Sequence, residues 1–287
     1  MAACLPSARK SRNRIWILFL ILAGCSIGHA QNKVVTIIQK SVQANNRDWD
    51  ADPQFDYTET DEDEQGTKTY QVTTILGTPY ERLVQINGKP LTAEQEAEQK
   101  SKFEKMLAER RAESSKKRAE RISKFKADRR RDHIMLAQLT KAFDFRLQGE
   151  QVVDGHKVYV LKATPREGYQ PPNRDSRVLT GMDGTLWIDK STFQWVKVEA
   201  HVIRPVSIEG VMAKVEPGTQ FAIEKAPVEG NIWLTTHYAM TASAKILSVL
   251  PHHSQEDDTY SNYHRRHSSN EKSSDDSKRG DSQHSSQ

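Results

Sequence analysis

The chain has 287 residues, with 42 lysines and arginines against 38 aspartates and glutamates, and only two cysteines. Four of the basic residues and none of the acidic ones precede residue 31, so the remainder is balanced in charge. This balance argues against a nucleic-acid partner, which requires a basic domain or face. Cys4 and Cys25 both lie in the first thirty residues, which excludes a disulfide or a thiolate metal site from the rest of the chain.

The first thirty residues have the pattern of a secretory signal peptide. Four basic residues precede an apolar run from Ile15 to Leu22, which is shorter than the roughly 20 residues needed to span a bilayer. Residues 28–30 (GHA) suit an ordinary signal peptidase, which would remove residues 1–30. Residues 22–25 (LAGC) are similar to a bacterial lipobox, in which residues 1–24 are removed and Cys25 carries the lipid. We therefore expect a periplasmic protein, or a lipoprotein anchored to the outer membrane if Cys25 is modified.

The end of the chain has the composition of a disordered segment. The stretch SSNEKSSDDSKRGDSQHSSQ is rich in serine and charge and has no apolar side chain to bury. Such a segment cannot offset the entropy lost on ordering. We expect a disordered polar tail over residues 254–287 and a folded body over residues 31–253.

The first part of the body predicts one helix followed by antiparallel strands. Residues 34–44 (VVTIIQKSVQA) carry apolar side chains at helical spacing. FDYTETDE and KTYQVTTIL alternate as strands do, and Asn87-Gly88 after the next strand is a strong turn signal. Thr92, with Gln95 three residues later, forms a capping box that starts a helix.

Residues 92–131 form a charged helical insertion between the predicted strands. The segment is rich in strong helix formers and has 14 basic and 8 acidic residues. No sustained heptad indicates a coiled coil. One interpretation is an arm that contacts anionic lipid headgroups or another acidic surface. The other is a long solvated helix, or a helical pair, held by internal ion pairs.

The remainder predicts a second apolar helix, Ile134 to Phe143, and then a β-meander. Asp154-Gly155 marks a hairpin, and GTLWIDKSTFQWVKVEAHVI reads as another. We count ten or eleven strands, consecutive and mostly linked by hairpins. Consecutive strands usually pair, so one large curled antiparallel sheet is expected in a mainly antiparallel α+β fold.

Some strands carry bulky apolar side chains on both faces. Alternation from residue 193 to 203 places Val196 and Val198 on one face and Phe193 and Trp195 on the other. A sheet plugged by a helix needs such strands, and so does a sheet that encloses an apolar cavity. Ordinary core packing is the alternative explanation for each aromatic residue. The candidates for the cavity lining are Trp187, Phe193, Trp195, Met212, Phe221, Trp233 and Tyr238.

Motifs that would indicate catalysis are lacking. The body histidines are scattered singly, without the spacing of a metalloprotease helix, and no G-x-S-x-G elbow or phosphate-binding glycine loop occurs. The acidic run at residues 61–64 has no Gly and lacks the ligand spacing of a calcium loop. We therefore expect no enzymatic activity, no cofactor and no metal.

The phrase GMDGTLWIDKSTFQWVKVEAHVI resembles the LolA-like group of periplasmic proteins, which includes lipoprotein carriers, the LolB receptor and RseB-type regulators. The match is in residues 186–189 (LWID), a short turn, and Lys197-Val198-Glu199. The resemblance implies an unclosed half-barrel covered by helices, with an apolar cavity that holds acyl chains. It covers about residues 33–250, and the charged insertion departs from it.

These observations lead to two functional expectations. The first is a non-catalytic carrier that binds an acyl chain or a lipoprotein in an apolar cavity. The alternative is an envelope sensor or scaffold that acts on a protein partner, or on a membrane surface, through residues 92–131.

Overall fold

The structure is a computed structural model that describes residues 15–207, 213–246 and 250–266. The helices are α1 (Ile15–Ala51), α2 (Ala93–Ala112) and α3 (Ser115–Ala142), with short 3-10 helices η1 (Asp52–Gln54) and η2 (Asp175–Gly181). The strands are β1 (Phe55–Asp63), β2 (Gly66–Ile75), β3 (Thr78–Ile86), β4 (Lys89–Pro90), β5 (Phe143–Val153), β6 (His156–Pro165), β7 (Met182–Asp189), β8 (Trp195–Val202), β9 (Val206–Ser207), β10 (Ala213–Val215), β11 (Gln220–Glu229), β12 (Ile232–Ile246) and β13 (Leu250–Arg265).

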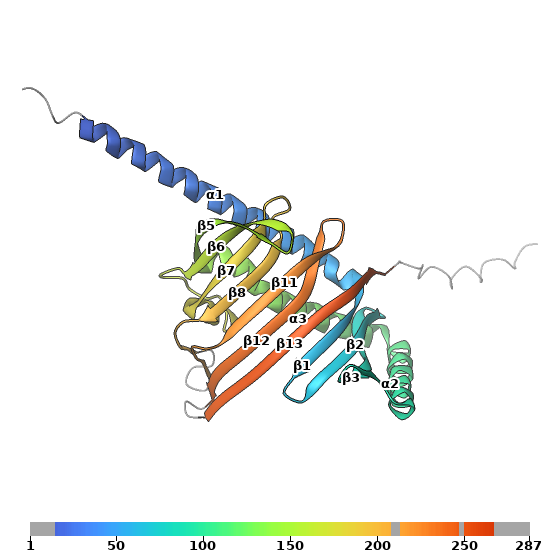
Figure 1. Cartoon of the computed structure of the whole chain (residues 1–287). Coiled ribbons are helices and arrows are strands. Elements are labelled where there is room, and N and C mark those ends of the chain that lie inside the picture. Colours follow the sequence, from blue (N-terminus) through green and yellow to red (C-terminus); the bar gives the residue numbers. More distant parts are fainter. Residues whose placement is uncertain (1–14, 208–212, 247–249, 267–287) are drawn as a thin grey trace, which may run out of the picture.

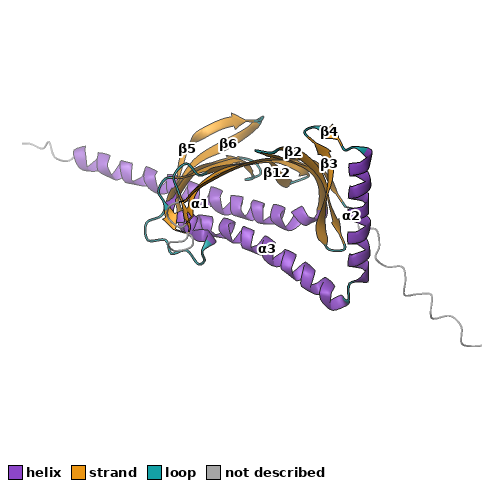
Figure 2. Cartoon of the chain, turned by 90° about the horizontal axis from the view of Figure 1, so that it is seen from below, coloured by secondary structure: helices purple, strands orange, loops and turns teal. Residues whose placement is uncertain are grey.

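The strands form one antiparallel sheet that does not close into a barrel. Its order is β4-β3-β2-β1-β13-β12-β11-β8-β7-β6-β5, and β9 and β10 attach beside β12. The sheet arches over α1 and α3, whereas α2 stands beside β3 and β4 at one end (Figure 2). Figure 1 shows the same arch from its convex side. The expected unclosed half-barrel covered by helices is confirmed.

Two tight turns have the backbone that the sequence predicts. Asn87 and Gly88 link β3 to β4 with φ of 51° and 70°, and Asp154 and Gly155 link β5 to β6 with φ of 48° and 81°. Positive φ at both central residues matches the twist of antiparallel strands. These hairpins follow directly from their dipeptides.

The predicted tail begins too early, because residues 254–265 belong to β13. This strand pairs with β12 on one side and β1 on the other, with Glu59 opposite Tyr260. Its polar composition hid it, since the backbone supplies most of its bonds and its rings pack on β1. Tyr57 lies 5.9 Å from Tyr260 and 5.3 Å from Tyr263 between ring centroids. Residues 267–287 of the predicted tail lie outside the described residues.

Helix α1 packs along the concave face and is longer than predicted. Val34, Ile37 and Ile38 are buried against Phe143 and Leu161 in the main apolar cluster. Burial of each such side chain stabilises the fold by about 1.5–3 kcal/mol. Helical structure continues from Asn45 to Ala51 although this stretch is mostly polar. Apolar periodicity therefore located the centre of the helix but not its ends.

The charged insertion folds as two helices joined at Glu113 and Ser114. The predicted capping box is present: Thr92 Oγ1 accepts from Gln95 N (3.3 Å), and Gln95 Oε1 accepts from Thr92 N (2.9 Å). The expected separate helix from Ile134 to Phe143 is wrong, because α3 runs without a break from Ser115 to Ala142. No Gly or Pro interrupts that stretch, so the change from polar to apolar sequence does not end the helix.

Two arginines attach the insertion to the β2–β3 hairpin. Arg110 donates to the carbonyl oxygens of Ile75 (2.8 Å) and Thr78 (3.1 Å). Arg121 donates to Leu76 O (3.2 Å) and to both carboxylate oxygens of Glu113 (2.7 and 2.6 Å). Charge-assisted bonds of this kind are stronger than neutral ones. The insertion is therefore fixed to the sheet at this hairpin. Among the described helices, none is both long enough and apolar enough to cross a bilayer.

The position of β13 in the middle of the sheet predicts opposite results for two truncations. A chain that ends at His253 loses the strand that joins β1 to β12, and we expect no cooperative thermal unfolding. A chain that ends at Arg266 keeps every described strand, and we expect a Tm within about 2 °C of the full chain. Circular dichroism melts would compare them. A normal melt of the shorter chain would contradict the pairing of β13.

Candidate functional site

A hollow of about 560 Å³ lies between the concave face of the sheet and helices α1 and α3. Strands β1, β8, β11, β12 and β13 form one wall, and the end of α1 with the C-terminal part of α3 forms the other. Its volume is in the range of small-molecule sites. The lining consists of Asn45, Asp48, Trp49, Asp52, Tyr57, His133, Leu136, Trp195, Ile223, Lys225, Leu234, Thr235, Tyr238, Glu256, Asp258, Tyr260 and Tyr263.

The strand register explains which side chains face the hollow from the sheet. Ile223 of β11 is opposite Tyr238 of β12, and Tyr238 is opposite Asp258 of β13. Directly opposed residues share a face, so this row projects together toward the helices. Two residues further along β13, Tyr260 projects the same way.

On the helical wall, Trp49 of α1 lies between two side chains of α3. The Arg129 guanidinium lies 4.7 Å from the Trp49 ring centroid, and the His133 ring stacks on Trp49 at 4.3 Å. Arg129 also forms an ion pair with Asp52 and donates to Trp49 O. Burial lowers the pKa of His133, and nearby Arg129 lowers it further, which favours the neutral ring. This stack joins α3 to α1 beside the hollow.

A buried polar group closes one end of the hollow. Asp48 is 1% exposed, and its Oδ1 accepts from Gln194 Nε2 (3.0 Å) and from Trp233 N (3.2 Å). Lys225 Nζ lies 3.5 Å from the other carboxylate oxygen and donates to Asn45 Oδ1 (2.9 Å). Burial raises the pKa of Asp48, against the opposing effect of Lys225, and burial lowers the pKa of Lys225. These groups are held by one another and serve as structure.

The sheet wall is acidic where β1 meets β13. Carboxylate oxygens of Glu59, Asp61 and Asp258 lie within 4.8 Å of one another. Burial first, and then repulsion from Asp61, Glu81 and Asp258, raises the pKa of Glu59 to about 7. By itself this cluster does not define a metal site.

Of the seven predicted lining residues, the structure brings Trp195 and Tyr238 together in the hollow. Phe193 and Phe221 pack against the main apolar cluster. Trp187 and Trp233 belong to a separate cluster with Val158, Val160 and Val196, and Trp233 is 3% exposed. Met212 lies outside the described residues, and of Cys25 the structure describes only its place in α1. Two of the seven predicted residues therefore line this hollow, and contact of the others with a ligand remains a proposal.

The expectation that Val196 and Val198 lie on one face of β8, with Trp195 on the other, is wrong. Trp187 pairs with Lys197 and Ile188 with Trp195, so Val196 is an extra residue in the ladder. Such a bulge rotates the strand locally. Trp195 therefore packs against the same cluster as Val198, whereas Val196 joins the other cluster. Strict alternation could not show this.

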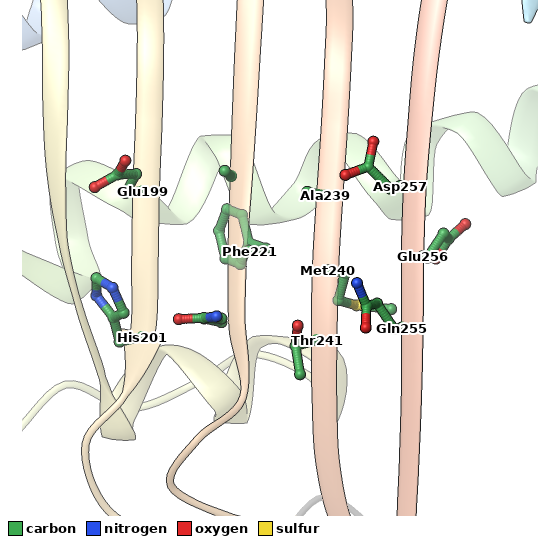
Figure 3. A pocket seen from close by; sticks show the side chains of 11 residues that line it. Glu199, His201, Phe221, Ala239, Met240, Thr241, Gln255, Glu256 and Asp257 are labelled. Carbon is green, nitrogen blue, oxygen red and sulfur yellow. The ribbon is translucent and has the colours of Figure 1, made fainter. Parts of the chain in front are cut away.

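Residues that sequence analysis missed dominate the hollow. Trp49, Tyr57, Tyr260 and Tyr263 come from the end of α1 and from β1 and β13, near the two ends of the described chain. A second, smaller depression of about 270 Å³ crosses β8, β11, β12 and β13. Figure 3 shows its rim, with Glu199 and His201 on one side and Asp257 on the other. Phe221 borders this depression rather than the hollow.

Comparisons with known proteins give structural similarity only. No protein-family model matches the chain, and no curated protein matches it. A LolA superfamily protein from Nitrosomonas europaea is 13% identical, with 81% of this chain and 93% of that chain covered and a TM-score of 0.29. A DUF1329 family protein from Desulfovibrio piger is 11% identical (81% and 92% covered, TM-score 0.30). An outer membrane lipoprotein-sorting protein domain from Vibrio parahaemolyticus is 10% identical (82% and 95% covered, TM-score 0.31).

The descriptions of the first and third structures name the group that the LWID hairpin resembles. At such TM-scores and identities they carry no argument about ligand, partner or activity. The fold of this chain is established by its own strand pairing, and its function has to be argued from its residues.

Because the pKa of Glu59 is raised, we predict that Glu59→Gln increases the thermal stability of the protein at high pH but not at low pH. The folded protein holds this proton up to about pH 7, whereas an unfolded chain releases it near the ordinary value of 4.5, so stability falls as pH rises between them. Glutamine mimics the protonated form. We expect Tm at pH 8 to rise by about 2–4 °C, or about 1 kcal/mol after allowance for partial exposure, with little change at pH 4.

The matched control is Glu62→Gln, an exposed residue of the same strand. It should leave Tm unchanged at both pH values. An equal effect of the two substitutions would show that Glu59 is not specially placed.

Proposed function

We propose that this chain is an exported, non-catalytic envelope protein that binds an acyl chain, free or on a lipoprotein, in the hollow. The observation that supports it best is the open space of about 560 Å³ under the arch, in the range of ligand sites. Leu136, Ile223 and Leu234 give it apolar surface, and Trp49 and Trp195 add two large rings. Burial of apolar ligand surface against such groups is favourable.

The lining is more polar than the apolar cavity expected from the sequence. Glu256, Asp258 and two tyrosines lie on β13, whereas Leu136 and Ile223 come from α3 and β11. The carboxylates on the helical side, Asp48 and Asp52, are paired with Lys225 and Arg129. An amphiphile, with one apolar end and one polar end, matches this division better than a pure hydrocarbon.

Export is supported by the basic and apolar leader pattern of the first thirty residues. The proposed compartment is the periplasm, or the outer membrane if Cys25 is lipidated. A non-catalytic role is supported by the contacts of Lys225, a lysine that lines the hollow. Its amine is bonded to Asn45 and Asp48, so these bonds hold it in a structural role. Mass spectrometry of the mature N-terminus tests the compartment, since an unmodified Gln31 start removes the anchor.

Filling the hollow should abolish ligand binding without unfolding the protein. Leu136 lines it from α3 and is only partly buried. We expect Leu136→Trp to reduce binding of a fluorescent dodecanoyl probe at least tenfold, because the indole occupies the space of the chain. Leu136→Ala enlarges the space and should change affinity less than threefold. Titrations followed by circular dichroism melts measure both, and equal binding by the two variants would place the ligand elsewhere.

A second function, contact with an anionic membrane surface, is favoured by the charge of α3. This helix has ten basic and three acidic residues, whereas α2 has five of each. Arg121, Ile122, Phe125 and Arg129 are partly buried toward the body, whereas Lys116, Lys117, Lys124, Lys126 and Arg130 are exposed. None of those five exposed cations forms an ion pair within the described residues. We name these five residues the basic face of α3.

Removal of charge from this basic face should weaken binding to anionic vesicles. Each lysine near an anionic surface contributes about 1 kcal/mol, so four substitutions lower the affinity by about two to three orders of magnitude. The variant is Lys116→Gln, Lys117→Gln, Lys124→Gln and Lys126→Gln, measured by co-sedimentation with phosphatidylglycerol vesicles.

The control removes the same number of exposed lysines from β4 and α2, at positions 89, 100, 102 and 105. Lys100 and Lys102 already lie beside glutamates. This control should bind nearly as the unchanged chain does. Equal losses in both variants would mean that net charge, and not the basic face, decides binding.

A further inference from the structure

We infer that the ligand of the hollow carries a cationic group, an amine or a quaternary ammonium, seated against the tyrosines and carboxylates of β1 and β13. This inference rests on the proposed function and adds the chemistry of the ligand's polar end. We name the surface concerned the tyrosine wall; it consists of Tyr57, Tyr238, Tyr260 and Tyr263, with Asp258 opposite Tyr238 and Glu256 two residues before Asp258 on β13.

The first argument is that the carboxylates of the hollow differ in their partners. On the helical side, Asp48 has Lys225 and Asp52 has Arg129. On the tyrosine wall, Asp258 is 5% exposed and accepts a hydrogen bond from the hydroxyl of Tyr260, at 3.3 Å. Burial first, and then the charge of Asp258 and a hydrogen bond to it, raise the pKa of Glu256. Within the described residues, neither Asp258 nor Glu256 forms an ion pair with a basic side chain. A buried carboxylate without a countercharge is costly, so a cation bound here is favoured.

The aromatic rings of the hollow show the same division. Trp49 carries the Arg129 guanidinium at 4.7 Å, and Trp195 carries the Lys225 amine at 6.0 Å. Both tryptophans therefore already have a protein cation on the ring. Among the described residues, no lysine or arginine lies over the rings of the tyrosine wall.

The geometry of the tyrosine wall suits a compact organic cation. The rings of Tyr57 and Tyr260 meet at 62°, and those of Tyr57 and Tyr263 at 37°. Rings at such angles present edges and faces from several sides, as in the aromatic cages that hold quaternary ammonium groups. The buried carboxylate of Asp258 adds direct charge attraction at low solvent exposure, and the exposed Glu256 adds a second negative charge beside it.

The apolar part of the hollow fixes the rest of the ligand. Leu136, Ile223 and Leu234 lie on the same cavity, so a cation with an alkyl chain occupies both regions at once. A free small cation would leave the apolar part unused. We therefore assign the ligand as a cationic amphiphile, and we treat a cationic side chain of a bound protein segment as the competing outcome.

The test compares two amphiphiles with the same dodecyl chain on the full-length protein, below their micellar concentrations. Dodecyltrimethylammonium is the cationic probe and dodecyl maltoside the neutral one, and isothermal titration calorimetry gives both affinities. We expect the cationic probe to bind at least tenfold tighter. Asp258→Asn combined with Glu256→Gln should reduce this ratio below threefold and leave the neutral probe unchanged.

The matched control is Asp257→Asn. Asp257 follows Glu256 on β13 and, like Glu256, borders the smaller depression, but it does not line the hollow. Its carboxylate is bonded to His237 (2.9 Å). It should leave the ratio as it is in the unchanged chain. The comparison of probes on the unchanged protein needs no variant, so a folding defect in either variant does not remove the test.

The outcomes separate the two levels of the proposal. If neither probe binds, the proposed function fails. If both bind equally, the hollow binds amphiphiles but the cationic inference is wrong. Choline that binds as tightly as the cationic probe would overturn the amphiphile, and displacement of the probe by oligolysine at equal concentration would assign the site to a protein segment instead.

Discussion

One buried carboxylate determines how helix α1 sits under the sheet. Asp48 is satisfied only if three parts of the chain meet it together: Gln194 after β7, the start of β12 through the Trp233 amide, and Lys225 of β11. Because a buried charge that loses a partner costs several kcal/mol, these contacts fix the rotation of α1 about its own axis. That rotation turns Trp49, the next residue, toward α3 and so sets one wall of the hollow.

The hollow stays open because its lining cannot collapse at low cost. Protein interiors are normally close-packed, and a space of this size among apolar side chains would be filled. Here continuous strand pairing holds the sheet in an arch. Two contacts fix the position of α3 beneath this arch. Arg121 attaches α3 to the β2–β3 hairpin, and Arg129 attaches it to Trp49. On the opposite wall, the buried Asp258 needs polar surroundings, which a collapsed apolar interior would deny it.

Local signals predicted local structure, and the site is not local. The Asn87-Gly88 turn and the capping box at Thr92 each depend on neighbours within a few residues, and the structure has both of them. Strand β13 escaped prediction because its sequence is polar and its partner Glu59 lies some two hundred residues away from Tyr260. The pairing of β13 with β1 also brings together most of the tyrosine wall. The polar composition of the chain end therefore hid both the strand and the site. Trp195 was placed on the wrong face by a single extra residue, which periodicity does not reveal.

Helix α3 connects the two surfaces that carry the functional proposals. Its outward side bears the basic face, and its inward side bears His133 and Leu136, which line the hollow. A shift of α3 relative to α1 would have to break the stack of Arg129 and His133 on Trp49, and that stack is itself part of the wall. A contact on the outside and a ligand on the inside would therefore act on the same packed helix. If either one favours a different position of α3, thermodynamic linkage requires that it change the affinity for the other by an equal factor. Under both proposals, α3 would link the charged insertion, in which the helix begins, to the wall of the hollow, which its later residues His133 and Leu136 help to form.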